Sequence, residues 1–128
     1  MPVRIVRLGS PRKPGEGLRI GTVRYPPRGV RKADLARRDF YDVWLPNLAP
    51  SPETLKRGLA AESDAEWKRF GRRYRAEMAR PEPGRVLDLL AALSHTSGFS
   101  VGCYCADESR CHRSLLRELL RARGAQVV

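Results

Sequence analysis

The sequence has few cysteines, few histidines and no long apolar run. Its 128 residues include three cysteines and two histidines. No apolar stretch approaches the roughly 20 residues that a membrane-spanning helix needs, and the first residues lack the apolar core of a secretory signal. From these absences we expect a cytoplasmic protein that makes no use of a membrane. An odd number of cysteines also argues against a disulfide framework, because cytoplasmic thiols normally stay reduced.

Acidic residues and lysines are scarce beside arginine. The chain has 14 acidic and 25 basic residues, which gives a formal net charge of +11. A surplus of this size favours anionic partners, either nucleic acid or a small anionic ligand. Arginine suits both, because it pairs with phosphate through two hydrogen bonds at once. The charge alone does not separate the two partners, and a basic surface can also be merely solvated.

Internal repeats and low-complexity tracts are absent too, so we expect a single domain over residues 1–128. Alternating apolar and polar residues predict strands at 3–8 and 18–25. The proline-containing segment 26–50 is too irregular for one long element. Loops of this length are often functional.

Helix signals dominate the middle of the chain. Ser51 followed by proline predicts a short helix that ends near residue 60. Ser63 and Glu66 form a capping box for a helix over 64–80. Apolar residues at helical spacing predict the core side of that helix: Trp67, Phe70, Tyr74 and Met78. Its other side is rich in arginine.

The sequence of the last third of the chain predicts helices that alternate with strands. The segment 81–84, PEPG, ends the arginine-rich helix, and a leucine-rich helix follows over 85–95. A short apolar strand at 99–105, a helix at 110–123 and a strand at 125–128 then form a βαβ unit, whose strands are parallel and joined by a right-handed connection. The fold class is therefore α/β, with a small mixed or mostly parallel sheet flanked by helices.

All three cysteines and one histidine lie where the predicted strand 99–105 turns into the next helix. Ligands of open α/β sheets bind outside the carboxyl ends of strands, beside helix N-termini with free N–H groups. Cys103 and Cys105 are two residues apart on a strand and share a face. Cys111 and His112 fall in the first helical turn, where the helix dipole and nearby cations lower the pKa of a thiol.

Three interpretations of this segment stay open. An anion or substrate pocket would use Cys111 and His112 as catalytic residues, with Cys105 and Arg113 among the ligand-binding residues. A zinc ion would instead take Cys103, Cys105, Cys111 and His112. Two features disfavour zinc: the C-x-C spacing is short, and adjacent helical residues diverge by about 100°. The third interpretation is a packed turn in which Cys103 is a small core residue.

The neighbouring side chains divide between the core and solvent. His112 aligns with leucines on the packed side of the predicted helix. Arg113 aligns with Arg117 and Arg121, which predicts a solvated stripe unless an anion sits at the helix start. His95 falls near a helix end, where we expect it to cap the helix rather than to act in catalysis.

A second basic cluster follows the predicted strand 18–25, in the stretch VRYPPRGVRK. Arg24 and Arg28 surround a turn in which Gly29 permits a close backbone approach. If this strand runs parallel to 99–105 in one sheet, its carboxyl end faces the same crevice as the cysteines. Both clusters would then line one pocket, and both arginines would bind the ligand.

Four motifs carry a family resemblance, in this order: VRYPPRGVRK, VWLPNLAPSPETL, WKRFGRRYRAEM and CYCADESRCHRSLL. With them the chain resembles the bacterial domain-of-unknown-function 488 family, including its YeaO-like branch. The resemblance implies a compact α/β domain with a pocket near the Arg and Cys-His-Arg motifs, and it supplies no reaction. YeaO-like members tend to have Asp-Arg-Leu-Trp-Pro-Arg-Gly where residues 23–29 of this chain read Val-Arg-Tyr-Pro-Pro-Arg-Gly.

These observations favour a small anionic-ligand-binding protein or enzyme, its ligand phosphate-bearing or otherwise charged. Arg24 and Arg28 would pair with the ligand, Cys111 would serve as thiolate and His112 would transfer or orient a proton. One alternative is a nucleic-acid-binding protein that uses the arginine-rich helix and the 28–38 loop. The other is a thiol-redox or Cys/His metal-binding protein. No cofactor is predicted under the first interpretation.

Overall fold

A computed structural model describes residues 2–128. Its centre is a four-stranded sheet made of β1 (Val3–Arg7), β2 (Leu18–Gly21), β3 (Val43–Trp44) and β4 (Phe99–Cys103). The strand order is β1-β4-β2-β3, and every neighbouring pair is parallel. The predicted α/β class with a mostly parallel sheet is confirmed.

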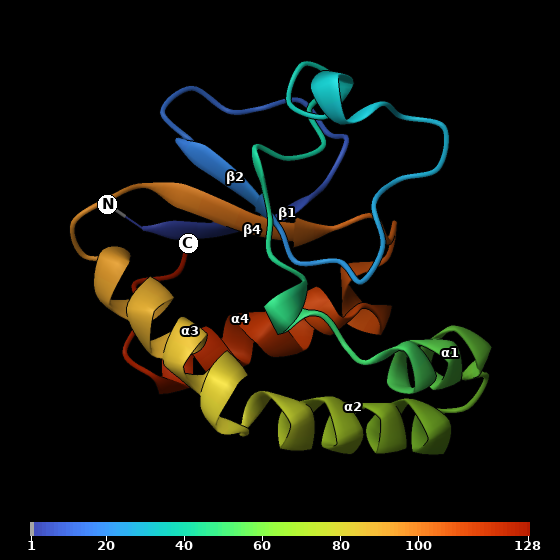
Figure 1. Cartoon of the computed structure of the whole chain (residues 1–128). Helices are drawn as coiled ribbons and strands as arrows, with labels where there is room; N and C mark the ends of the chain where they lie inside the picture. Colours follow the sequence, from blue (N-terminus) through green and yellow to red (C-terminus); the bar gives the residue numbers. More distant parts are fainter. Residues whose placement is uncertain (1) are drawn as a thin grey trace.

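The helices gather on one face of this sheet (Figure 1). They are α1 (Pro52–Ala60), α2 (Asp64–Met78), α3 (Pro81–Leu93) and α4 (His112–Ala122). The connection from β2 to β3 crosses the other face and contains the 3-10 turn η1 (Lys32–Asp34) (Figure 1). Two more 3-10 turns, η2 (Pro46–Leu48) and η3 (Glu108–Arg110), precede α1 and α4. Among residues 2–128 no helix has the length and apolarity that crossing a bilayer requires.

Two apolar clusters cover the two faces of the sheet. The larger joins the strands to the helices, and Ile20 and Val101 contribute to it from β2 and β4. The smaller lies under the β2–β3 connection and includes Tyr41 and Cys103. Gly21 lets this connection approach closely, since a Cβ there would lie 2.4 Å from the ring of Tyr41.

Local signals place the helix starts as predicted. The hydroxyl of Ser51 accepts the N–H of Thr54 at the start of α1, and that of Ser63 accepts the N–H of Glu66 at the start of α2. The predicted core positions of α2 are confirmed as well. Phe70, Tyr74 and Met78 are buried, and the half-buried Trp67 stacks on Phe70.

Element ends differ from the predictions where tertiary contacts decide them. β2 ends at Gly21 rather than 25, because the chain turns away after Thr22 and the Val23 carbonyl accepts the indole N–H of Trp44 instead of a strand partner. The PEPG segment follows α2, but it also forms the first turn of α3. Pro81 is the first residue of α3. Proline lacks an N–H, but no hydrogen bond is lost there because the N–H of a first helical residue has no partner within the helix.

The predicted C-terminal βαβ unit is present, but its strands are shorter than predicted. β4 ends at Cys103 rather than 105, and α4 starts at His112 because η3 occupies the preceding residues. The predicted last strand is a single parallel bridge between Val127 and Val3. β1 therefore lies between β4 and the C-terminal segment, and all three run in the same direction.

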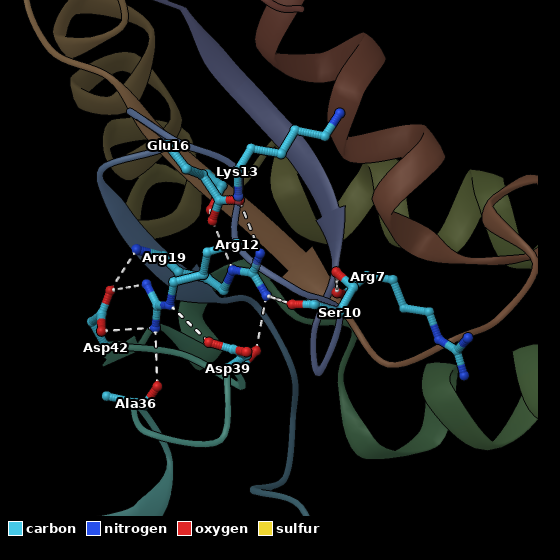
Figure 2. Close-up of polar contacts among 10 residues, drawn as sticks. Arg7, Ser10, Arg12, Lys13, Glu16, Arg19, Ala36, Asp39 and Asp42 are labelled. Atoms are coloured by element: carbon cyan, nitrogen blue, oxygen red, sulfur yellow. Dashed lines mark hydrogen bonds and ion pairs between the residues drawn. The ribbon is translucent and has the colours of Figure 1, made fainter.

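A buried ion pair anchors the connections on the face opposite the helices (Figure 2). Arg19 of β2 is 0% exposed and makes two hydrogen bonds with Glu16, at 2.8 and 2.9 Å. Its remaining nitrogen donates to the carbonyl oxygens of Ser10 and Asp39, each at 2.8 Å. Glu16 also accepts the hydroxyl of Ser100 on β4.

Arg12 continues this network at the surface. Its guanidinium binds both carboxylate oxygens of Asp42, at 2.8 and 3.0 Å, and the carboxylate of Asp39 at 3.3 Å (Figure 2). Asp42 in turn accepts the backbone N–H of Arg19. Two irregular segments, around residues 10–17 and 36–42, are thereby held against β2.

Candidate functional site

The carboxyl ends of β2 and β4 open into one cavity. The strands are parallel neighbours, with Gly21 paired to Gly102, so the segments that follow them leave the same edge of the sheet. A cavity of about 390 Å³ lies at this edge, and its lining includes Arg24 and Arg28 after β2 and Cys105 after β4. The two clusters that the sequence predicts at one pocket are therefore brought together.

The walls of this cavity, called here the thiol cavity, are mainly apolar. They come from the segment after β2, from α1 and from the residue after β4: Tyr25, Pro26, Pro27, Leu55, Leu59 and Tyr104. Tyr25 and Leu59 are 57% and 75% exposed, which places them at the open side of the lining. A ligand that fits this lining has an apolar or planar body in addition to any charge.

The three thiols form a cluster of which Cys105 is the most accessible member. Cys103 and Cys111 are 6% and 2% exposed, whereas Cys105 is half-buried. The sulfur atoms of Cys103 and Cys105 are 3.7 Å apart. The expectation that Cys103 is a small core residue is confirmed, although its side chain also reaches the lining of the thiol cavity.

Of the three thiols, Cys105 is the one whose pKa is lowered. Hydrogen bonding with Cys103 and Cys111 lowers the pKa of the Cys105 thiol, and the charge of Arg113 acts in the same direction against the effect of burial. The hydrogen bond to Cys105 raises the pKa of Cys103. These directions make Cys103 the donor and Cys105 the acceptor of the contact between their sulfur atoms.

The pKa of Cys111 is raised rather than lowered, through its hydrogen bonds to Cys103 and Cys105 and through burial. The reason lies in its place relative to α4. Cys111 is the residue that precedes the helix, and its side chain makes no capping hydrogen bond with the free N–H groups of the first turn. The lowered thiol pKa that the sequence predicts at Cys111 is found at Cys105.

His112 is buried on the packed side of α4, as its alignment with leucines predicts. Its ring is 4% exposed, and its Nε2 lies 2.8 Å from the carbonyl oxygen of Thr22. A carbonyl can only accept, so Nε2 carries the proton and Nδ1 is left free. Nδ1 lies 4.0 Å from the sulfur of Cys111. Burial lowers the pKa of His112, so the ring is a neutral base at neutral pH.

Arg113 is buried, and the predicted solvated stripe is wrong at this position. It is 5% exposed, its Nη1 donates to the carbonyl oxygen of Cys103 at 3.3 Å, and its Nε has no hydrogen-bond partner. Within residues 2–128 no carboxylate pairs with it. Arg117, one turn later, pairs with Glu108 at 2.7 Å. The first turn of α4 packs beneath the end of β4. The exposure of Arg113 therefore differs from that of the arginines one and two turns later on the same side of the helix.

The two arginines of the other cluster differ in what they can offer a ligand. Arg24 donates to three backbone carbonyl oxygens, those of Pro46, Ala49 and Pro50. It therefore fixes the segment before α1 against the thiol cavity. Arg28 is exposed, and in the part of the chain that the structure describes it makes no ion pair. It is the cation that can meet an incoming anion.

Three residues of the cluster could hold a metal ion. The ligand atoms of Cys103, Cys111 and His112 lie within 4.8 Å of one another. The sequence disfavours zinc because Cys111 and His112, as neighbours on a helix, would point in different directions. In the structure Cys111 has an extended backbone (φ −128°, ψ 145°) and lies outside the helix, so this argument against zinc does not hold. Sulfur and imidazole nitrogen are donors that zinc takes. Cys105, the fourth residue of the predicted set, does not belong to this group of three.

Other charged residues lie apart from the thiols. Arg57, Arg69, Arg72 and Arg73 line a second cavity between α1 and α2, which shares no lining residue with the thiol cavity. His95 binds the carbonyl oxygen of Gly124 at 2.7 Å, beyond the end of α4, rather than the end of its own helix. Its predicted place near a helix end holds, but the bond crosses to a neighbouring segment.

Sequence reasoning missed two parts of the site. Leu55 and Leu59 line the thiol cavity from α1, a helix whose charged composition gives no sign of a binding role. The charge on Cys105 was also missed, because it depends on two thiols that approach only in the folded chain. The one available signal was the gathering of all three cysteines in nine consecutive positions, 103–111.

Comparison with known proteins gives a family and no reaction. The model of the family DUF488-N3a, described as the active DUF488-N3 subclade, matches residues 3–124. No curated protein and no solved structure matches the chain significantly.

Proposed function

Since the chain belongs to the DUF488 family, whose description names no substrate, we propose from the site itself that the thiol cavity binds a small anionic ligand and that Cys105 attacks it as a thiolate. The observation that carries this proposal is the buried Arg113 without a carboxylate partner. Burying an unpaired cation costs several kcal/mol. Arg113 does not line the thiol cavity, so the anion that its charge stabilises is the Cys105 thiolate.

Each side chain has a distinct role in this proposal. Arg28 attracts the ligand at the open side of the cavity, and Arg113 stabilises the Cys105 thiolate from within the protein. Cys103 contacts the thiolate at a sulfur–sulfur distance of 3.7 Å, and His112 offers its free Nδ1 as a base, 4.0 Å from the sulfur of Cys111. The apolar walls reduce the water around the sulfur, which strengthens these electrostatic effects.

The reaction class that fits is nucleophilic attack by sulfur. The lone pair of the Cys105 thiolate forms a bond with an electrophilic atom of the ligand, and the bond from that atom to its leaving group breaks. The thiolate is the form that reacts, so a thiol with a lowered pKa is nucleophilic at neutral pH. A covalent adduct on Cys105 is the expected intermediate or product.

Competition between two alkylating probes tests this proposal. Iodoacetate carries a negative charge and iodoacetamide none, so their rate ratio at a given thiol reports local positive charge. We expect Cys105 to be modified first, with a ratio several-fold higher than for a free thiol. Arg28→Gln should lower the ratio. Arg121→Gln, which removes an exposed charge late in α4, is the matched control and should leave it unchanged.

First modification of Cys103 or Cys111 would overturn the assignment of the nucleophile. A rate ratio equal to that of a free thiol would overturn the anionic ligand. Inorganic phosphate provides a second readout, because an anion bound at Arg28 should slow the reaction with iodoacetate.

A metal role is the second candidate, favoured by the close approach of Cys103, Cys111 and His112. Zinc would be held there as a structural ion, with the thiols as thiolates. Metal analysis of protein purified under reducing conditions separates the two functions. Stoichiometric zinc that is lost in Cys111→Ser supports the metal role, whereas zinc-free protein with a reactive Cys105 counts against it.

Nucleic-acid binding is the third candidate, and it uses the other cavity. Arg69 and Arg72 are exposed on α2, and neither has an acidic partner among residues 2–128. Phosphate contacts release counterions, so affinity for a short duplex should fall steeply with salt, by a log–log slope near −0.9 for each contact. Removing both charges by Arg69→Gln and Arg72→Gln should flatten that slope.

A further inference from the structure

Cys103 lies close to the nucleophile Cys105, and the proposed function gives this proximity no role in the chemical step. Its sulfur lies 3.7 Å from that of Cys105, close to van der Waals contact. The two residues share a face of the chain, and a bend at Tyr104 directly after β4 draws their side chains together. Both line the thiol cavity, whereas Cys111 does not. Any sulfur-bound adduct on Cys105 would therefore form within reach of a second thiol.

We propose that Cys105 and Cys103 act together as a dithiol that reduces a disulfide bond in an anionic ligand, which leaves the two cysteines joined to each other by a disulfide. This inference rests on the proposed function, because it uses Cys105 as the nucleophile. It adds the substrate class, an anionic disulfide, and a role for Cys103 as the resolving thiol.

The reaction takes two exchange steps. In the first, the Cys105 thiolate attacks one sulfur of the ligand, the ligand S–S bond breaks, and one ligand thiolate leaves. In the second, Cys103 gives its proton to that departing thiolate, and its sulfur attacks Cys105. The mixed disulfide breaks and the second ligand thiolate leaves. Two electrons have passed from the cysteine pair to the ligand, and the pair is oxidised to a disulfide.

The order of the two thiols follows from their surroundings. Cys105 is the more exposed of the two and is the one that a ligand in the cavity can reach, so it attacks first. Cys103 is 6% exposed and its sulfur lies 3.7 Å from that of Cys105, so it reacts only after the mixed disulfide has formed beside it. An accessible attacking thiol beside a buried second thiol is the arrangement that two-step thiol–disulfide exchange uses.

The lining of the cavity selects the kind of disulfide. Tyr25, Tyr104 and Leu59 offer apolar surface, and Arg28 offers an unpaired cation at the mouth among the residues that the structure describes. An aromatic disulfide with carboxylates matches both features. Dithiobis(nitrobenzoate) is such a probe, and each thiolate that it releases is coloured. Dithiodipyridine is an aromatic disulfide without the negative charge.

The experiment counts the thiolates that are released when reduced protein meets one equivalent of dithiobis(nitrobenzoate). We expect two per chain, no retained nitrobenzoate by mass spectrometry, and a peptide in which Cys103 and Cys105 are cross-linked. Cys103→Ser should release one and keep the adduct on Cys105, and Cys103→Ala should do the same. Arg121→Gln, which removes an exposed charge late in α4, is the matched control and should still release two. Circular dichroism of each variant verifies that it is folded.

The outcomes separate this inference from the proposed function. A stable adduct on Cys105 in the unchanged protein, or loss of the second release in Cys111→Ser instead of Cys103→Ser, overturns the role of Cys103 and leaves the proposed function standing. If Cys105→Ser releases the first thiolate as fast as the unchanged protein, both fail. The rate advantage of dithiobis(nitrobenzoate) over dithiodipyridine should shrink several-fold in Arg28→Gln. An unchanged advantage would overturn the preference for an anionic disulfide.

Discussion

The chain buries two arginines at the sheet in opposite ways. Arg19 of β2 is 0% exposed and has a full set of partners: both oxygens of Glu16 and two backbone carbonyl oxygens (Figure 2). Arg113 of α4 is 5% exposed and has one weak bond, to the carbonyl oxygen of Cys103, with no carboxylate partner in the described part of the chain. Its Nε has no partner at all.

We propose that the difference separates a structural charge from a functional one. The partners of Arg19 come from segments that it holds in place, so its charge is neutralised within the protein. The charge of Arg113 lies beside a thiol cluster that carries its own negative charge only when Cys105 is ionised. Under the proposed function, this buried cation stabilises the anion that forms on Cys105.

Breaking the Arg19 pair should give the largest loss of stability. In Glu16→Gln the buried guanidinium loses its counterion, and we expect the free energy of unfolding to fall by about 3–5 kcal/mol. Urea denaturation measures this change. Glu53→Gln removes one partner of an exposed pair with Arg57 and should cost less than about 1 kcal/mol. Equal losses in the two variants would contradict the structural role of the buried pair.

Acid should weaken the same pair in a defined pH range. Burial alone would raise the pKa of Glu16, but hydrogen bonds from Arg19, the backbone of Lys13 and Ser100 lower it to about 2. A carboxylate with a lowered pKa stabilises the folded state above its unfolded value of 4.5, and this stabilisation is lost as the pH falls through about 2. The free energy of unfolding should drop by about 3 kcal/mol over that range. The drop should be absent in Glu16→Gln, and its persistence there would assign it to other carboxylates.

Removing the other arginine should leave stability nearly unchanged. Arg113→Met deletes a buried cation that has no acidic partner among residues 2–128, so we expect the free energy of unfolding to change by less than about 1 kcal/mol, or to rise. Arg19→Met is the contrasting variant. It leaves Glu16 buried without its cation, and about 3–5 kcal/mol should be lost. A loss of that size in Arg113→Met would make Arg113 a structural residue as well.

The parts of the fold that local sequence decides are the parts that could be predicted. Ser51 and Ser63 cap helices through residues three positions away, and the apolar spacing of α2 fixes its buried side. The strand order could not be predicted in the same way. β4 pairs with both β1 and β2 across more than half of the chain, and no local pattern specifies such partners.

The same limit explains the site. The meeting of Arg24 and Arg28 with the cysteines follows from the carboxyl-end rule once two strands are parallel neighbours, so it was predictable. The burial of Arg113 was not predictable, because helical spacing assigns the same exposure to residues of the first turn as to aligned residues of later turns. That turn packs beneath the end of β4. The backbone of Cys111 likewise departs from the predicted helix, which places its sulfur near His112.

The pH dependence of Cys105 alkylation by iodoacetamide, resolved by mass spectrometry, shows whether Arg113 stabilises a Cys105 thiolate. We expect a midpoint well below the ordinary thiol pKa of about 8.5, and an upward shift of about one pH unit or more in Arg113→Met. Arg121→Met, which removes an exposed charge from α4, should leave the midpoint in place. A midpoint of about 8.5 that is the same with and without Arg113 would mean that Arg113 does not stabilise a thiolate on Cys105.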